Sequence, residues 1–155
     1  MNTEKDNPVI KLRGKLDKLC AVILEAQLLG EEKGNTGFVN DLQEILEFVR
    51  SLFTIEYENT TLGEISILGL SSGEIREQSH NPEKYFGRKH LLMHHSMGPL
   101  CLRLNLLRTL VRETELAAIS VNQYTAEALN SLSGLFYILI YKYLPDNYTI
   151  NHYVC

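Results

Sequence analysis

Four stretches of the chain repeat apolar residues every three or four positions, and this spacing constrains the fold more strongly than any other feature. Residues at such a spacing line one face of an α-helix. The first two stretches carry Leu12, Leu16, Leu19, Ile23, Ala26, Phe38, Leu42, Ile45, Val49 and Leu52. Gly34, Asn35 and Gly37 interrupt the pattern between them. We therefore expect an antiparallel hairpin of two helices over residues 11–32 and 38–58.

The other two stretches lie in the second half of the chain. One begins at Pro99, a residue suited to the first turn of a helix, and continues to Val121. Asn122 can then cap a last helix over residues 123–143, because its side chain can accept a hydrogen bond from a free backbone amide. Pro145 ends that helix.

A long connection over residues 59–98 joins the two halves, and glycines interrupt any periodicity in it. Ser71 and Glu74 have the spacing of a capping box, so we expect one short helix to begin at Ser72. The basic and histidine residues of the connection, which favour a functional role, are Arg76, His80, Lys84, Arg88, Lys89, His90, His94 and His95. The prediction is an all-α fold: an up-and-down bundle of four long helices plus one short helix in a long connecting loop.

Composition places the chain among ordinary folded proteins. Its 155 residues are 45% hydrophobic and 22% charged, which predicts a single domain over 1–155 with loose tails at 1–10 and 146–155. No apolar run opens the chain, and the three cysteines are widely spaced, so we expect a cytoplasmic protein in which Cys20 and Cys101 are small core residues. The net charge of -4 predicts no nucleic-acid partner, and no segment predicts a membrane partner.

The helix that begins at Pro99 carries charges beside its apolar residues. On a helical wheel, the first apolar stripe consists of Leu100, Leu104, Leu107, Val111 and Ala118. A second apolar stripe on the far side consists of Leu102, Leu106 and Leu110. A helix that is apolar on nearly every face is expected to be buried. Arg108, Arg112 and Glu115 adjoin the first stripe, so the pattern predicts that these charges are buried and need partners.

Two interpretations of these charges remain open. Glu115 follows Arg112 by three residues and can pair with it, and Asp17 on the first helix is a suitable partner for Arg108. Such pairs can be an internal network that fixes the helix register. Alternatively, two arginines one turn apart can bind a phosphate or carboxylate ligand, because a guanidinium donates to two oxygens at once. Asn130, a polar residue within an apolar helix, either satisfies a backbone group or meets a polar ligand.

Three segments of the chain resemble one protein family. The sequence Arg-Thr-Leu-Val-Arg-Glu-Thr-Glu at 108–115 resembles the helix signature of ATP:corrinoid adenosyltransferases. Leu-Asn-Ser-Leu-Ser at 129–133 and Gly-Lys-Leu-Asp-Lys-Leu at 14–19 resemble two further elements of that family, in the same order along the chain. Gly-Leu-Ser at 69–71 and Ser-His-Asn-Pro at 79–82 resemble its ethanolamine-utilisation branch.

The resemblance implies a function and a set of site residues. It implies transfer of the 5′-deoxyadenosyl group of ATP to the cobalt of reduced cob(I)alamin, with Mg²⁺, in a homotrimer whose active sites lie between subunits. By motif position, Arg112, Arg108 and Asp17 would be catalytic, and Arg112, Glu115 and Asn130 would bind the nucleotide. The resemblance to the ethanolamine-utilisation branch is also compatible with an association with a metabolic microcompartment.

The corrinoid contacts and a second function are also predicted. The family places a bulky hydrophobic residue ahead of the arginine helix, so the resemblance implies that His90, Leu92 and Met93 face the corrinoid. No metal site is predicted. The alternative function is a non-catalytic corrinoid-binding or scaffold module, because Met1–Val9 contains nothing like the Thr-Gly-x-Gly-Asp-x-Gly phosphate loop of the better-known branch. The enzyme is favoured because a scaffold has little reason to keep charges that destabilise its core.

Overall fold

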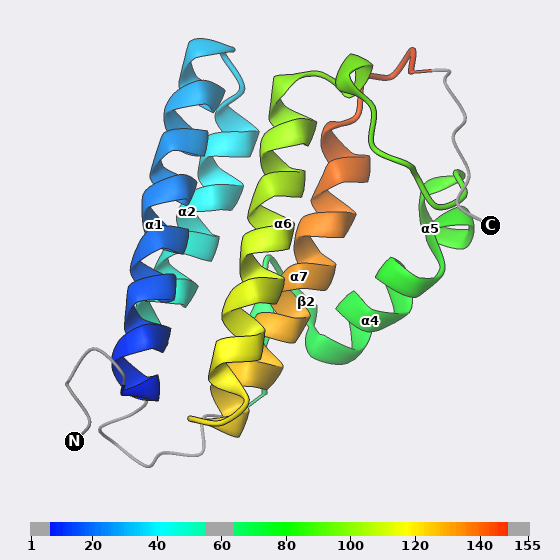
Figure 1. Ribbon diagram of the computed structural model, residues 1–155. Coiled ribbons are helices and arrows are strands. Elements are labelled where there is room, and N and C mark those ends of the chain that lie inside the picture. The colour runs from blue at the N-terminus through cyan, green and yellow to red at the C-terminus, as the bar shows by residue number, and fades with distance from the viewer. Residues whose placement is uncertain (1–6, 55–63, 149–155) are drawn as a thin grey trace.

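Four long helices form a bundle in the computed structural model, which describes residues 7–54 and 64–148. They are α1 (Pro8–Glu32), α2 (Thr36–Ser51), α6 (Pro99–Ala118) and α7 (Gln123–Tyr143). Figure 1 shows α1 beside α2, α6 beside α7, and α1 also against α6. The predicted all-α bundle is therefore confirmed.

Asparagine caps fix the starts of three of these helices. The side chains of Asn7, Asn35 and Asn122 accept backbone hydrogen bonds of 2.9–3.0 Å at the first turns of α1, α2 and α7. The bounds of α7 agree with the prediction. Helix α1 begins three residues earlier than expected, and α6 ends three residues earlier. Helix α2 ends at Ser51, and the predicted continuation over 55–58 lies outside the described residues.

The long connection contains more structure than the single short helix expected. A two-residue pair of antiparallel strands, β1 (Ser66–Ile67) and β2 (Leu70–Ser71), is followed by α4 (Ser72–His80), α5 (Pro82–Phe86) and the 3-10 turn η2 (His95–Met97). Leu68 and Gly69 both have positive φ, 53° and 76°, as a tight two-residue hairpin requires. Helix α4 begins at Ser72 behind the predicted Ser71–Glu74 capping box, so that prediction is confirmed.

The connection also changes the order of helix directions. It carries the chain back along the bundle, so that α6 begins at the end where α2 begins and both run the same way (Figure 1). Ion pairs between Glu25 and Arg103 and between Lys15 and Glu113 show that α6 is antiparallel to α1. The expected simple alternation of directions is therefore wrong, because a connection this long can span the bundle.

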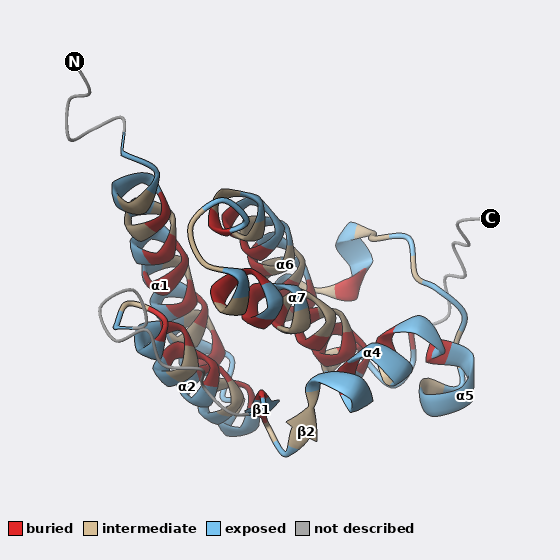
Figure 2. Ribbon diagram, turned by 90° about the horizontal axis from the view of Figure 1, so that it is seen from below, coloured by how far each residue is buried: buried red, intermediate tan, exposed pale blue. Residues whose placement is uncertain are grey.

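The core lies where the four long helices meet. Figure 2 shows buried residues along their facing sides, whereas α4 and α5 expose their outer sides. Helix α7 contributes the most buried residues, among them the fully buried Phe136, and Cys20 and Cys101 are buried as predicted. Tyr148, in the segment predicted to be a loose tail, is also buried. Among the helices of the described residues, none is long and apolar enough to cross a membrane.

One face of α6 differs from the prediction. Leu102 and Leu106 were expected to be buried, but they are 37% and 42% exposed. Leu24 and Leu28 on α1 are exposed as well, at 46% and 56%. The prediction was wrong because α1 and α7 pack against the other sides of α6, and a helical wheel contains no information about which sides are covered.

Candidate functional site

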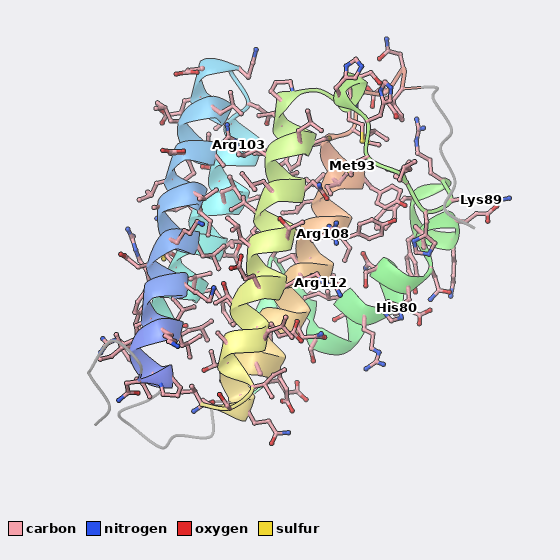
Figure 3. The ribbon with its side chains drawn as sticks, in the orientation of Figure 1. His80, Lys89, Met93, Arg103, Arg108 and Arg112 are labelled. Carbon is pink, nitrogen blue, oxygen red and sulfur yellow. The ribbon has the colours of Figure 1, made fainter. Side chains whose placement is uncertain are left out.

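A cleft of about 840 Å³ lies between α4, α6 and α7. Arg108 and Arg112 line it from α6, and Asn130 and Tyr137 line it from α7. Figure 3 shows both arginines on the side of α6 that faces α4, whereas Arg103 lies on the side that faces α1. The cleft has the size of a small-molecule site. It therefore brings together residues of two sequence motifs from neighbouring helices.

Helix α4 forms the third wall. Arg76 and His80 are one turn apart on α4 and both line the cleft. The helix approaches α7 closely because Gly134 has no side chain: a Cβ atom there would lie 3.0 Å from Cγ2 of Ile75 and 3.3 Å from Oγ of Ser79. Ile75 and Ser79 are buried in this contact. The wall that carries Arg76 and His80 is thus packed firmly against α7.

The predicted burial of the motif charges is wrong. Arg108 and Glu115 are half-buried, and Arg112 and Asn130 are exposed. Arg108, Arg112 and Asn130 line the open cleft, and Glu115 is bonded to Asn130 beside it. Desolvation is therefore partial, so these charges can remain ionised without internal partners.

The predicted pairing of Arg108 with Asp17 is also wrong within one chain. Arg108 donates from Nε and from a terminal nitrogen to Oδ1 of Asn105, at 3.1 and 3.0 Å. Asp17 is exposed on α1, and the edge of α6 that faces α1 carries Arg103 and Glu113 instead. Within residues 7–54 and 64–148, Asp17 and Arg108 form no ion pair.

The predicted pair of Arg112 with Glu115 is not formed either. Oε1 of Glu115 accepts a hydrogen bond of 3.0 Å from Nδ2 of Asn130. The observed partner of Asn130 is therefore a side chain of α6, which is neither the backbone group nor the ligand of the two interpretations made from the sequence. Arg112 has no carboxylate within salt-bridge distance in the described part of the chain. Its guanidinium is available to a ligand.

The electrostatics of the cleft favour an anion. The pKa of Arg108 is lowered, first by burial and then by the positive charge of Arg112, while Tyr137 opposes the shift. Arginine remains protonated in proteins, so the lowered pKa indicates a partly desolvated cation that a second cation also repels. A bound anion would relieve that repulsion.

A chain of hydroxyl groups fixes the orientation of His90 at one end of the cleft. Tyr141 donates to the carbonyl of Lys89 at 2.9 Å, and the hydroxyls of Tyr137 and Tyr141 are 3.0 Å apart. Because the carbonyl can only accept, Tyr141 has no second proton, and Tyr137 must donate to Tyr141. Tyr137 then accepts from the amide of Leu91 and from Nδ1 of His90, at 3.3 and 3.0 Å. The network assigns the proton to Nδ1 and leaves Nε2 of a neutral His90 as an acceptor.

The other residues predicted to face the corrinoid lie outside the cleft lining. Leu92 is 50% exposed, and Met93 packs partly against the core. His94 bonds Ser96 and stacks on His95. Among the described residues, no group of three or more histidine, cysteine, aspartate or glutamate side chains is arranged to hold a metal ion.

Several cleft residues were not identified from the sequence as site residues. They are Glu127, Gly134 and Tyr137. A signal existed on α7, because Gly134 and Tyr137 follow Asn130 by four and seven residues and so share its face. The sequence favoured a functional role for Arg76 and His80, but it could not place them in this cleft, because the contact of α4 with α7 joins segments far apart in the sequence.

Comparison with known proteins identifies the class to which this fold and cleft belong. The family model described as cobalamin adenosyltransferase matches residues 1–143, so the chain belongs to that family, as its motifs predicted. Corrinoid adenosyltransferases EutT from Escherichia coli strain K12 and from Salmonella typhimurium are each 30% identical to it over 145 residues. The alignments cover 88% of this chain and 53% of each relative, so the chain spans about half their length. No solved structure matches the chain.

Proposed function

We propose that this chain transfers the 5′-deoxyadenosyl group of ATP to the cobalt of reduced cob(I)alamin, in ethanolamine utilisation. The observation that supports it most is that Arg108, Arg112 and Asn130, from two family motifs, line one cleft of nucleotide size. The relatives EutT are corrinoid adenosyltransferases by name. We expect the protein in the cytoplasm, alone or with a metabolic microcompartment.

The proposed reaction requires little covalent chemistry from the protein. The electron pair of Co(I) attacks the ribose C5′, the cobalt–carbon bond forms, and the C5′–oxygen bond breaks as the polyphosphate leaves with its bonding electrons. An external reductant supplies Co(I). The protein orients the two substrates and stabilises the charge on the leaving polyphosphate. Arg112 suits the second task, because its fork of donors opens to the cleft and no carboxylate of the described chain occupies it.

Asn130 and Glu115 suit the nucleotide and its magnesium. The bond from Asn130 to Glu115 orients the amide and leaves its oxygen and second N–H for the nucleotide. Mg²⁺ usually binds one or two carboxylates together with substrate phosphates. Glu115 beside the cleft and Glu127 in its lining are suitable carboxylates, so the residues present fit an ATP-bound magnesium.

The corrinoid would approach from the end of the cleft at His90. The acceptor nitrogen Nε2 of His90 can bind an amide group of the corrinoid periphery, and the exposed Leu92 offers an apolar contact nearby in sequence. Met93 would support this segment from the core side.

A homotrimer with active sites between subunits would explain two further features. Leu24 and Leu28 on α1 and Leu102 and Leu106 on α6 are exposed apolar residues on two helices in contact, as expected of a surface that binds another protein copy. Asp17 and Arg108 do not meet inside one chain, so their pairing would require a neighbouring subunit. Light scattering coupled to size-exclusion chromatography should give three times the chain mass.

The decisive experiment supplies the chain with cob(I)alamin, ATP and Mg²⁺ under strongly reducing, anaerobic conditions. Formation of adenosylcobalamin, followed by its absorbance, should depend on ATP. If cobalamin binds and no product forms, the chain is the alternative, a non-catalytic corrinoid-binding module.

A further inference from the structure

The cleft has arginines on two opposing walls. Arg108 and Arg112 line it from α6, and Arg76 and His80 line it from α4. The family motifs gave roles to Arg108 and Arg112 on the α6 wall, whereas Arg76 lies outside the motifs and His80, within the Ser-His-Asn-Pro motif, was given no role. The question is what kind of ligand would need both walls.

These arginines have no carboxylate counter-ion among residues 7–54 and 64–148. Arg108 donates to the neutral amide of Asn105, and neither Arg112 nor Arg76 lies within 4.0 Å of a carboxylate in the described residues. The carboxylate that lines the cleft, Glu127, accepts a hydrogen bond from Gln123. Lys84 on α5 differs from them, because it lies 3.6 Å from Glu77 of α4. Three arginines without a carboxylate partner in the described residues therefore line one cleft.

The α4 wall is also held in place. Its first turn is closed by the capping box of Ser71 and Glu74, and its inner side packs on Gly134. The hydroxyl of the buried Ser79 is bonded to the carbonyl of Arg76 at 3.2 Å. Small polar residues of α7, Ser131 and Ser133, line the floor between the walls. The result is a trough with two fixed cationic sides and a hydroxyl-bearing floor.

A ligand that fits such a trough carries several negative charges along its length. A single carboxylate or phosphate is satisfied by one arginine fork, whereas a polyphosphate chain presents oxygens in both directions. We propose that Arg76 and His80 form a second polyphosphate-binding wall, so that the phosphate chain of ATP lies across the cleft between α4 and α6. This inference rests on the proposed function for the identity of the nucleotide, and its binding test does not require catalysis.

The test measures binding of inorganic tripolyphosphate, ATP and adenosine to the whole chain by calorimetry. Arg76→Ala should weaken tripolyphosphate and ATP by about tenfold and leave adenosine unchanged, because one charge-assisted contact is lost. His80→Ala should act in the same direction more weakly. Lys84→Ala is the matched control, because Lys84 is a nearby exposed cation paired with Glu77 outside the cleft lining. Arg76 is exposed, so its replacement should leave the circular dichroism unchanged.

The outcomes separate this inference from the proposed function. If the wild-type chain fails to bind tripolyphosphate, or Arg76→Ala binds it as tightly as Lys84→Ala does, the second wall is wrong. If adenosyl transfer occurs and Arg76→Ala leaves the KM for ATP unchanged, the proposed second polyphosphate wall is wrong and the proposed enzyme activity is retained. If Arg76→Ala weakens tripolyphosphate while the wild-type chain transfers no adenosyl group, the wall stands and the reaction is wrong.

Discussion

The two edges of α6 carry the same types of residue and use them differently. On the edge that faces α1, Arg103 pairs with Glu25 at 4.0 Å and Glu113 pairs with Lys15 at 2.8 Å. On the edge that faces α4, Arg108 has an amide for a partner and Arg112 has no carboxylate within the described chain. One edge thus joins two helices, and the other is left for a ligand. The role of each charge on α6 therefore depends on which residue of another helix lies opposite it.

The largest expected effect comes from replacing one arginine on each edge of α6 separately. Arg112→Ala should lower kcat/KM for adenosyl transfer by about 100-fold or more, because a charge aimed at the leaving polyphosphate is lost. Arg103→Ala should stay close to wild type, since its ion pair lies at the opposite edge. Steady-state kinetics on folded, purified variants measure both. Equal losses in the two variants would remove the distinction between the edges.

A second test asks whether the α1 side is mainly structural. A Cβ at Gly30 would lie 2.6 Å from Cδ1 of the fully buried Phe38, so Gly30→Ala should reduce the free energy of unfolding by about 1–3 kcal/mol. Gly14 is also within α1 and has no atom within 4 Å of the added Cβ. Gly14→Ala should therefore stabilise the chain by about 0.5–1 kcal/mol. Urea denaturation measures both free energies of unfolding. If the two substitutions had similar effects, the close contact of Gly30 with Phe38 would be contradicted.

A smaller effect is expected on the position of the proton of His90, at one end of the cleft. Tyr141→Phe removes the hydroxyl that accepts from Tyr137, so Tyr137 can donate to Nδ1 of His90 instead. The proton of His90 should then move to Nε2, which ¹⁵N NMR of the imidazole detects. Tyr143→Phe is the control, because Tyr143 lies on the same helix and donates to Asp41. An unchanged His90 spectrum in Tyr141→Phe would exclude the assigned proton order.

The smallest effect lies on the α1 edge. Lys15 lowers the pKa of Glu113 through a hydrogen bond and its charge. A lowered carboxyl pKa stabilises the folded state at pH values above the ordinary carboxyl pKa of 4.5. This contribution is lost as the pH falls through the lowered pKa. Lys15→Ala should lower Tm by no more than about 2 °C at pH 7, because exposed ion pairs contribute little. The difference in Tm between wild type and Lys15→Ala should vanish at a pH below the lowered pKa of Glu113. Calorimetric scans at pH 7 and at that acidic pH measure it, and a difference that persisted in acid would contradict the prediction.

The sequence predicted the helices well because their determinants are local. The apolar spacing from Leu12 to Ala26 and the Asn122 cap specify helix faces and starts within one or two turns. The family motifs likewise identified Arg108, Arg112 and Asn130, which do share a cleft.

The partners of those residues could not be predicted in the same way. A wheel placed Arg108, Arg112 and Glu115 beside an apolar stripe, and burial was the natural inference. It was wrong because the neighbouring space is an open cleft, and the nearest partner of Glu115 is Asn130 on another helix.

By itself, then, the sequence determined the family, the four long helices and the charged strip of α6. Only the tertiary structure decided which edge of α6 is paired and which faces a ligand, and that α4 adds Arg76 and His80 to the cleft. The physical reason is distance along the chain. Helix formation depends on contacts within about four residues, whereas the cleft depends on the close approach of Ile75 to Gly134, which no local pattern encodes.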